Sequence, residues 1–325
     1  MSLLGRRPLR AIAIGLVLLV ALVVVPLPLA SYHQDLATRV LIFALFAMSL
    51  DLLYGYAGLM SLGHAAFFGV GGYTVGLLMV QRDVTSLWAG AAIALVATAV
   101  AAAIFGIVAL RVRGVYFILV TFALGQMLAS LGQQWHVLQA GGAEAVAGIL
   151  QPEIPPFTIL WDSLSFYYFA LVVVVAATLG LIAIVRSRFG DALKGIRENE
   201  TRMAALGYDP WRLKYAAFVI SGVFAGIAGI LFAYQNGLIA PTNVDVAQSG
   251  LVLLMVILGG AGSLVGAALG AVVVVLVQYW ATDLVPERVN LVMGSLFVAT
   301  VLVLRGGLAP TLARVARTVG GARAR

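Results

Sequence analysis

A strongly charged segment between two uncharged apolar runs constrains this chain more than any other feature. Residues 186–214, RSRFGDALKGIRENETRMAALGYDPWRLK, hold seven of the 20 Lys and Arg residues and four of the 13 Asp and Glu residues. The flanking runs, 166–185 and 215–244, carry no charge. Since about 20 apolar residues span the ~30 Å hydrocarbon core of a bilayer, each run is long enough to cross it. The charged segment must then lie in water beside the membrane.

The composition extends this conclusion to the whole chain. Of the 325 residues, 62% are hydrophobic and only 10% are charged, which excludes a soluble domain of this size. We therefore predict an all-α, polytopic membrane protein. The absence of cysteine excludes disulfides, thiolate metal sites and thiol catalysis. The net charge of +7 would suit nucleic-acid binding, but Arg and Lys beside membrane spans are more typical of cytoplasmic loops.

The distribution of Lys and Arg predicts the orientation of the chain in the membrane. With a cytoplasmic N-terminus, 17 of the 20 basic residues fall on the cytoplasmic side, and Arg39, Arg82 and Arg288 fall outside or at the far interface. The 17 lie in residues 1–10, in the turn with Arg111 and Arg113, in 186–214 and in the tail from Arg305. The predicted outer segment, about 135–165, has acidic residues but no Lys or Arg. By the positive-inside rule, both termini are predicted to be cytoplasmic.

Eight to ten crossings fit the apolar runs, and ten fit the charge map. The candidate spans are about 11–30, 39–57, 60–80, 86–110, 114–134, 166–185, 215–236, 247–259, 263–281 and 288–304. The uncharged run 246–282 is too long for one ordinary span, and Gly259, Gly260 and Gly262 mark a turn or break within it. The run 11–30 has the length of a signal peptide, but Pro28 and Ala30 make a poor cleavage site. We expect an uncleaved span there.

Two glycine-rich stretches share the pattern G-x-x-S-L-x-x-A-A. They read GLMSLGHAA at 58–66 and GAGSLVGAA at 260–268. An internal repeat is one interpretation, and the recurrence of small residues wherever membrane helices pack closely is the other. In and after the first stretch, the chain carries Gly63, Gly69, Gly71, Gly72 and Gly76. These glycines exclude a simple lipid-facing helix and predict a helix interface or the wall of a pore.

Few ionisable side chains lie inside the predicted spans. Asp51 falls in the second span, where a carboxyl group is costly unless it is paired, neutral or facing water. It is either functional or close to the cytoplasmic interface. His64 suits a proton relay, a solute contact or a hydrogen bond between packed helices, and the last is the commonest use of such a residue. His33 and His136 lie in predicted outer loops, so the sequence has neither a metal-binding spacing nor an HExxH motif.

The charged segment has the pattern of one amphipathic helix. Asp191 suits its first turn, Leu193, Ile196, Met203 and Leu206 recur on one face, Glu198 and Arg202 are spaced i, i+4, and Gly207 and Pro210 supply the stop. Two interpretations are open. The helix lies in the lipid headgroup layer, or its apolar ridge docks into a groove on a soluble partner.

Four stretches of the chain resemble one family of membrane proteins. They are SLGHAAFFGVGGYT (61–74), LRVRGVYFILVTFALGQM (110–127), SRFGDALKGIRENETRMAALGYDPWRLKYAAFVISGVFAGIAG (187–229) and LLMVILGGAGSLVGAALGA (253–271). These stretches resemble branched-chain amino acid ABC transporter permeases of the LivM type, in the right order from about 39 to 304. The resemblance implies an all-helical permease of the bacterial inner membrane. Its transmembrane domain would be 11–304, between a cytoplasmic N-terminus of 1–10 and a basic cytoplasmic tail of 305–325.

The resemblance also implies partners, and it adds Glu200, Ala204, Ala205 and Gly207, which match the family's acidic, Ala-Ala and Gly positions, to the candidate residues that the sequence pattern suggests. The partners would be a second, LivH-type permease, two cytoplasmic ATPases and an extracytoplasmic substrate-binding protein, besides membrane lipid and without nucleic acid. The segment 186–214 would couple the permease to the ATPases, and its candidate residues are Leu193, Ile196, Glu200, Met203, Ala204, Ala205, Leu206 and Gly207. Candidates for the solute path are Asp51, Ser61, His64, Gly69, Gly259 and Gly260. The chain itself would bind no metal and no cofactor, and its partners would use the ATP.

The chain departs from the family pattern at three places. QAGGAEAVAG (139–148) replaces a segment that is commonly rich in Thr-Gly-Gly, LRGGLAP (304–310) replaces the usual Arg-Pro-Arg-Gly, and Asp51 stands where Asn is more usual. The first two departures bear on substrate class or partner fit. Permeases of this type also import urea and short amides, so the resemblance leaves the solute open.

The source of energy follows from what the sequence lacks. It contains no G-x-x-x-x-G-K-[ST] motif, and its only lysines, Lys194 and Lys214, lie outside any phosphate-binding loop. The chain therefore cannot hydrolyse ATP alone, and the expected mechanism is alternating access driven by partner ATPases. A secondary transporter that uses Asp51 and His64 as a proton-carrying pair is the alternative from another class. A membrane enzyme is disfavoured because no pair of nucleophile and base is visible.

Overall fold

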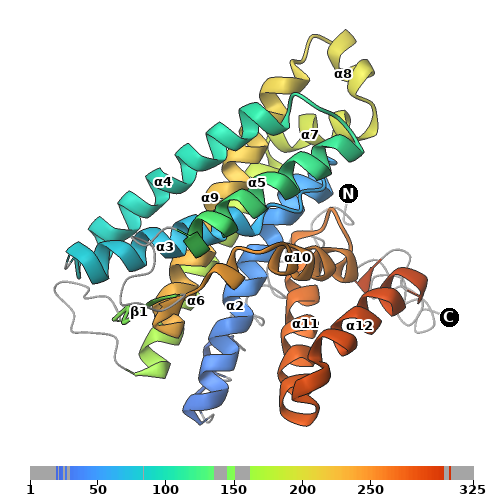
Figure 1. The fold of residues 1–325 in the computed structure, drawn as a ribbon. Coiled ribbons are helices and arrows are strands. Elements are labelled where there is room, and N and C mark those ends of the chain that lie inside the picture. The colour runs from blue at the N-terminus through green and yellow to red at the C-terminus, as the bar shows by residue number, and fades with distance from the viewer. Residues whose placement is uncertain are drawn as a thin grey trace, which may run out of the picture.

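The protein is almost entirely helical (Figure 1). A computed structural model describes residues 20, 22–24, 26–27, 30–82, 84–134, 145–150, 162–303 and 307–308. Its α-helices are α2 (Ser31–Asp51), α3 (Ala65–Arg82), α4 (Leu87–Ala109), α5 (Val115–Gln134), α6 (Ser163–Arg186), α7 (Arg188–Glu198), α8 (Glu200–Ala205), α9 (Pro210–Asn236), α10 (Val246–Gly259), α11 (Leu264–Leu284) and α12 (Val289–Val303). The shorter elements are the π-helical turn η1 (Leu52–Tyr56), the 3-10 turns η3 (Pro241–Asn243) and η4 (Pro286–Arg288), and the strands β1 (Val146–Ala147) and β2 (Leu238–Ile239).

Seven described segments are long and apolar enough to cross a membrane. They are Ser31–Tyr56, Leu87–Ala109, Val115–Gln134, Ser163–Arg186, Pro210–Asn236, Pro241–Gly259 and Leu264–Leu284. The helix α3, with 18 residues, and α12, with 15, are not among these seven, although both lie where a span was predicted. The all-α, polytopic membrane fold is thereby confirmed. The predicted span 11–30 and the tail 305–325 fall largely outside the described residues, as does 1–10 entirely.

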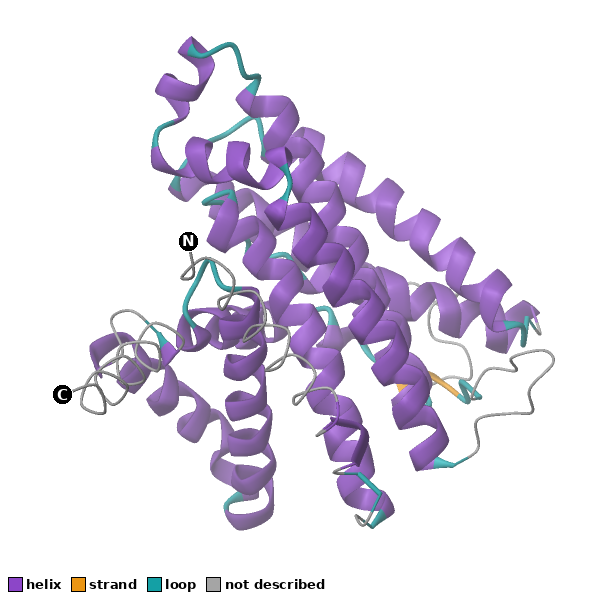
Figure 2. Cartoon of the chain, turned by 180° about the vertical axis from the view of Figure 1, so that it is seen from behind, coloured by secondary structure: helices purple, strands orange, loops and turns teal. Residues whose placement is uncertain are grey.

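Several long helices run between an end that carries α8 and an end that carries β1, whereas α10 lies across the bundle (Figures 1 and 2). At the α8 end, the turn after α4 reaches α8 through an ion pair of Arg113 with Glu200. At the β1 end, β1 and β2 pair antiparallel, with Val146 opposite Ile239.

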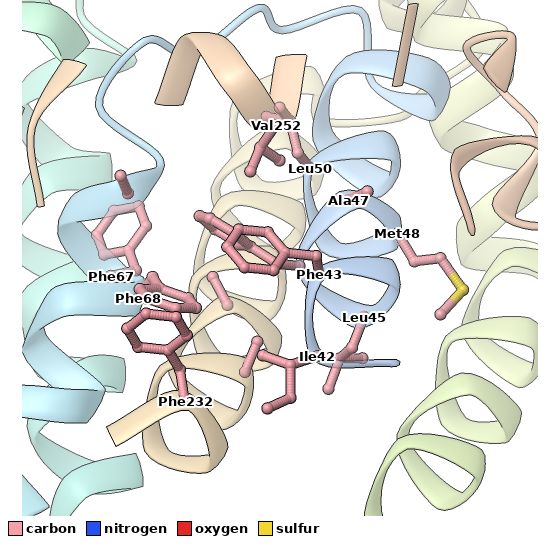
Figure 3. Packing of buried hydrophobic residues seen from close by; sticks show 14 of the residues in the cluster. Ile42, Phe43, Leu45, Ala47, Met48, Leu50, Phe67, Phe68, Phe232 and Val252 are labelled. Atoms are coloured by element: carbon pink, nitrogen blue, oxygen red, sulfur yellow. The ribbon is translucent and has the colours of Figure 1, made fainter. Parts of the chain in front are cut away.

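Buried aromatic side chains hold the central helices together (Figure 3). Phe43 of α2, Phe68 of α3 and Phe232 of α9 meet in one cluster, with ring centroids 6.1 Å apart between Phe43 and Phe232 and 5.2 Å apart between Phe68 and Phe232. Phe46 stacks on Phe68 at 4.6 Å. Such pairs add about 0.5–1.5 kcal/mol each beyond the burial of their area. They fix α2, α3 and α9 as the core of the bundle.

Glycines allow α3 and α9 to pack backbone against backbone. A Cβ at Gly71 of α3 would overlap the carbonyl oxygen of Gly226 in α9, and a Cβ at Gly229 of α9 would overlap that of Phe68 in α3. Any larger residue at these positions would push the two helices apart. The prediction that the glycine-rich segment after residue 60 forms a helix interface is confirmed.

The long uncharged run from residue 246 breaks at the glycines, as predicted. The helix α10 ends at Gly259, and the turn before α11 places Gly260 at φ 103° and Gly262 at φ 89°. Residues with a Cβ rarely adopt such angles. The two helices then cross closely, because a Cβ at Gly270 of α11 would overlap the carbonyl oxygen of Met255 in α10. The helix α10 is therefore a short membrane segment folded against α11.

The predicted span 60–80 begins too early, because residues 57–64 form a loop rather than a helix. Side chains from other helices accept hydrogen bonds from one backbone N–H of this loop and from the first N–H of α3. Leu62 N donates to Thr121 Oγ1 of α5 at 3.3 Å, and Ala65 N donates to Ser249 Oγ of α10 at 2.9 Å. Non-helical backbone at membrane depth is tolerated only when protein or water satisfies it in this way.

The two G-x-x-S-L-x-x-A-A stretches occupy related but unequal positions. Each forms a connection between two membrane helices and begins with a glycine of positive φ, Gly58 at 73° and Gly260 at 103°. Ser263 caps α11 by accepting a hydrogen bond from Gly266 N at 3.1 Å. Ser61 lies four residues before α3 begins and makes no such cap. The shared letters thus do not give the same local structure.

Cysteine labelling tests the predicted orientation, and the cysteine-free chain gives a clean background. Leu150 follows β1 and Glu287 lies in η4, and both are exposed, as is Thr201 of α8. We expect single cysteines at Leu150 and Glu287 to react with an impermeant maleimide in intact cells. A cysteine at Thr201 should react only after lysis. The reverse pattern would contradict the predicted orientation.

Candidate functional site

The charged segment 186–214 folds as two short helices at one end of the bundle, followed by the start of α9 (Figure 1). The prediction of a single amphipathic helix is wrong, because the backbone is extended at Asn199, with φ −159° and ψ 99°. The Asn199 side chain caps α8 by accepting a hydrogen bond from Arg202 N at 2.8 Å. The predicted i, i+4 pair of Glu198 and Arg202 spans this break, so the two residues do not share one helix.

The predicted apolar ridge is also wrong as one surface. Leu193 and Ile196 of α7 are buried inside this chain, and Leu193 belongs to the main hydrophobic core. Met203 is half-buried and packs over Gly195, where a Cβ would lie 2.6 Å from its sulfur. Only Leu206 is exposed, at 67%. The apolar face of α7 therefore anchors the segment to the membrane helices.

The outward-facing part of the segment is α8 and the turn after it. Ala204, Ala205 and Leu206 are exposed, and Gly207, two residues after the end of α8, has φ 89°. Gly207 N donates to the carbonyl oxygen of Ala204 at 3.0 Å and Tyr208 N to that of Met203 at 3.2 Å, which is a Schellman ending. The predicted left-handed stop at Gly207 is confirmed. Together with the exposed rings of Tyr208 and Trp211, these residues form an apolar tip, which we call the α8 tip.

Ion pairs fix α8 to the rest of the chain. Glu200 accepts a hydrogen bond from Lys214 Nζ of α9 at 2.7 Å and lies 3.6 Å from Arg113 in the turn after α4. Lys214 and Glu200 are mostly shielded from water, which strengthens the pair relative to an exposed one. Asp209 caps α9 by accepting from Trp211 N and Arg212 N at 3.1 and 3.2 Å, and Pro210 opens that helix instead of stopping the preceding one. Glu200, a candidate for contact with an ATPase, therefore pairs with Lys214 and Arg113 of its own chain.

Arg197, at the end of α7, connects the charged segment to the membrane helices. Its Nη1 donates a hydrogen bond to the carbonyl oxygen of Gly55 in η1. Asp51, one turn earlier, accepts a hydrogen bond from Gly262 N at 2.7 Å, in the turn between α10 and α11. Arg197 also interacts electrostatically with Asp51. A Cβ at Gly262 would lie 3.1 Å from Nη1 of Arg197. We call Asp51, Gly55, Arg197 and Gly262 the joint.

The residues around the joint are closely packed. A Cβ at Gly55 would overlap Asp51 Oδ1 and Gly262 N. A Cβ at Gly58 would lie 3.2 Å from Cγ of Arg197, and one at Gly307, after α12, would overlap Gly260. The end of α7 thus touches the connection from α2 to α3 and the turn from α10 to α11. The sequence alone did not single out Arg197 as a functional residue, because it is one of seven basic residues in the same charged segment.

His64 lies in a buried polar cluster in the middle of the helices. Its Nε2 lies 2.9 Å from Ser49 Oγ of α2, and its ring stacks on Phe46 with centroids 5.6 Å apart. Ser221 Oγ of α9 donates to the carbonyl oxygen of Ser49 at 2.6 Å. These contacts are those of a residue that packs helices together. The sequence did not predict a role for Ser49 or Ser221, because single serines are common in membrane helices.

The six candidates for the solute path are all buried within this chain. They are Asp51, Ser61, His64, Gly69, Gly259 and Gly260. Asp51 is part of the joint, Gly260 lies in the same turn as Gly262, and the others lie in separate helix contacts. A Cβ at Gly69 would overlap the side chain of Val244, and one at Gly259 would overlap the carbonyl oxygen of Gly266. The structure thus does not bring the six together on one surface.

A groove of about 480 Å³ runs between α10, α11 and α12. Its polar lining comes from Thr242, Gln248, Gln278 and Asn290, and Leu62 of the loop before α3 also reaches it. Polar groups at membrane depth normally face protein or water rather than lipid. The groove is therefore suited to contact with another protein or with a water-filled path.

Comparison with known proteins assigns the family. Residues 32–304 match the family described as the permease component of the branched-chain amino acid transport system. The chain is 30% identical over 315 residues to the high-affinity branched-chain amino acid transport system permease protein LivM of Salmonella typhimurium, covering 90% of this chain and 73% of the relative. It is 26% identical over 278 residues to the probable LivM permease of Methanocaldococcus jannaschii, covering 75% and 81%.

A more distant relative has a different named role. The autoinducer 2 import system permease protein LsrC of Yersinia enterocolitica is 30% identical over 171 residues, which cover 50% of this chain and 44% of the relative. No solved structure matches the chain. The family match covers nearly the whole helical region. It establishes that this chain belongs to the family of branched-chain amino acid transport permease components and is a membrane permease of an ABC importer.

Proposed function

We propose that this chain imports branched-chain or chemically related amino acids, together with a second permease of the LivH type, two cytoplasmic ATPases and an extracytoplasmic binding protein. Its similarity to LivM over 90% of its length supports the solute class. The similarity to LsrC, which is named as the permease of an autoinducer 2 import system, indicates that related permeases serve other solutes. Urea and short amides, which the family resemblance left open, are the competing solutes.

The observation that carries the coupling part of the proposal is the contact of Arg197 with Gly55. The α8 tip is exposed and apolar, which suits docking into a groove on an ATPase. Arg197 joins the same segment to the turns of α2 and α10–α11. Movement of a docked ATPase would be passed by this contact to the membrane helices as a rigid-body shift. The α8 tip therefore replaces the ridge with Leu193 and Ile196 as the proposed docking surface.

The proposed partner permease covers the groove of α10, α11 and α12. Thr242, Gln248 and Asn290 line it, and Leu291 and Leu302 of α12 are exposed at 68% and 69%. A partner helix would bury the apolar residues and enclose the polar ones in a path for the solute. Substrate would then pass between the two permeases, next to α10.

Uptake by the reconstituted complex tests the solute class. We expect proteoliposomes that contain the permease pair, both ATPases, internal ATP and external binding protein to accumulate labelled L-leucine. Excess unlabelled valine or isoleucine should compete, and urea should not, because urea lacks the charged groups of an amino acid. Accumulation of urea without leucine would assign the chain to the amide importers instead.

A further inference from the structure

Arg39 was predicted to lie outside or at the far interface, but α2 begins at Ser31, so Arg39 lies within this membrane helix and away from the joint. It lies eight residues after the start of α2 at the β1 end, about 12 Å along the helix. Its Nε is buried and has no hydrogen-bond partner, and its guanidinium lies 5.8 Å from the ring centroid of Phe43. Among the described residues, no carboxylate forms a salt bridge with it. Such an arginine is costly at membrane depth unless an anion meets it.

The arginine lines a cavity of about 400 Å³ between α2 and α11. The cavity walls are Tyr32, Leu36, Arg39, Val275, Gln278, Tyr279, Thr282 and Asp283. Asp283 is exposed in the last turn of α11, and the rings of Tyr32 and Tyr279 lie 5.6 Å apart. The volume lies in the range of small-molecule sites. One cation and one carboxylate therefore line one cavity without pairing with each other.

These groups match a small zwitterion. A guanidinium binds a carboxylate through two parallel hydrogen bonds, and a carboxylate with nearby hydroxyls binds an ammonium. Leu36 and Val275 supply apolar wall for an aliphatic side chain. Gln278 lines both this cavity and the groove of α10, α11 and α12, so the two adjoin on α11. A neutral amide would leave both charges unmet.

We propose that this cavity is a binding site for the zwitterionic α-amino acid on its way into the groove, with Arg39 on the carboxylate and Asp283 on the ammonium. The proposal rests on the proposed function and adds a site on the permease itself. A phosphatidylethanolamine headgroup has the same pair of charges, so the test must separate solute from lipid.

Thermal unfolding of the purified permease–ATPase complex, without binding protein, measures the site directly. A ligand that binds the folded state raises the unfolding midpoint with its concentration. We expect L-leucine to raise it, and leucinamide, which lacks the carboxylate, and N-acetyl-L-leucine, which lacks the ammonium, to have little effect. Arg39→Gln should raise the half-saturating leucine concentration about tenfold, whereas Arg39→Lys keeps the charge and should lose less.

Two further variants test the role of Asp283 and serve as a control for the loss of an arginine outside the cavity. Asp283→Asn changes an exposed wall residue and should weaken leucine while allowing N-acetyl-L-leucine to bind comparably, even if Arg39→Gln impairs folding. Arg288→Gln removes an exposed arginine of η4 outside the cavity and should leave the leucine response unchanged. Equal leucine responses in wild type, Arg39→Gln and Asp283→Asn would overturn the proposal.

Lipid titration separates the two sources of a zwitterion. If phosphatidylethanolamine raises the midpoint of the delipidated complex, Arg39→Gln abolishes that rise and leucine has no effect, the cavity is a lipid site and the proposal fails. ATP-driven leucine uptake by the wild-type complex is measured in parallel. Normal uptake with no effect of the cavity variants refutes only this site, whereas absence of uptake in wild type refutes the proposed function.

Discussion

Replacing Arg197 by alanine is expected to uncouple ATP hydrolysis from transport. The substitution removes the hydrogen bond to the carbonyl oxygen of Gly55 and the positive charge beside Asp51. A hydrogen bond to a charged group contributes about 1.5–3 kcal/mol, so the linkage should weaken about tenfold or more. The α8 tip is unchanged, so ATPases should still bind and hydrolyse ATP. Leucine uptake per ATP hydrolysed should fall by a similar factor.

The matched control for Arg197→Ala is Arg202→Ala. Arg202 is exposed on α8 and only its backbone N takes part in the cap of that helix. The variant removes the same charge from the same segment without touching the joint, and uptake should stay near wild type. Arg197→Lys should restore part of the coupling, since a lysine keeps the charge. Equal uptake per ATP in Arg197→Ala and Arg202→Ala would show that the joint carries no coupling.

Replacing Leu206 by aspartate is expected to detach the ATPases. Leu206 is 67% exposed at the α8 tip, and in the proposed complex it lies in an apolar groove. Burying an unpaired carboxylate there costs roughly 3 kcal/mol or more, which weakens binding about a hundredfold. The amount of permease in the membrane should not change, because Leu206 contributes nothing to the hydrophobic core. Co-purification of the ATPases with tagged permease measures the effect.

Two further variants test whether the effect of Leu206→Asp is specific to that position. Thr201→Asp adds the same charge in the first turn of α8, where a helix favours it, and should retain the ATPases. Gly207→Val strains a residue with φ 89° and should act more mildly than Leu206→Asp. Full ATPase retention and normal uptake in Leu206→Asp would instead favour the interpretation that α8 lies in the lipid headgroup layer.

The membrane helices were predictable from sequence because their signal is long and redundant. A run of about 20 apolar residues predicts a membrane span from its own composition, without knowledge of the residues that pack against it. The break at Gly259 and Gly260 was also predicted correctly, because glycines interrupt an apolar run that is too long for one span. The family was predicted correctly from the four motif stretches. The loop at 57–64 was missed because N–H groups in it and at the start of α3 donate to Thr121 and Ser249, which lie far away in sequence. Hydropathy alone cannot predict such partners.

The charged segment was predicted less well, because its fold depends on tertiary contacts. The spacing of Leu193, Ile196, Met203 and Leu206 fits one helix face, yet Asn199 caps a second helix and divides the four. Leu193 then packs inward while Leu206 faces outward. Arg197 was not singled out for the same reason, since its partner Gly55 is 142 residues away.

The source of energy tests the central claim most directly. The secondary-transport alternative requires Asp51 and His64 to act as a proton-carrying pair, whereas the structure gives Asp51 the amide of Gly262 and His64 the hydroxyl of Ser49 as partners. An asparagine at position 51 retains an oxygen that can accept from Gly262 N. Leucine uptake by proteoliposomes of the complete complex, with and without internal ATP and an imposed proton gradient, should require ATP and persist at a substantial rate in Asp51→Asn. Uptake driven by the proton gradient without ATP, and abolished in Asp51→Asn, would contradict this account.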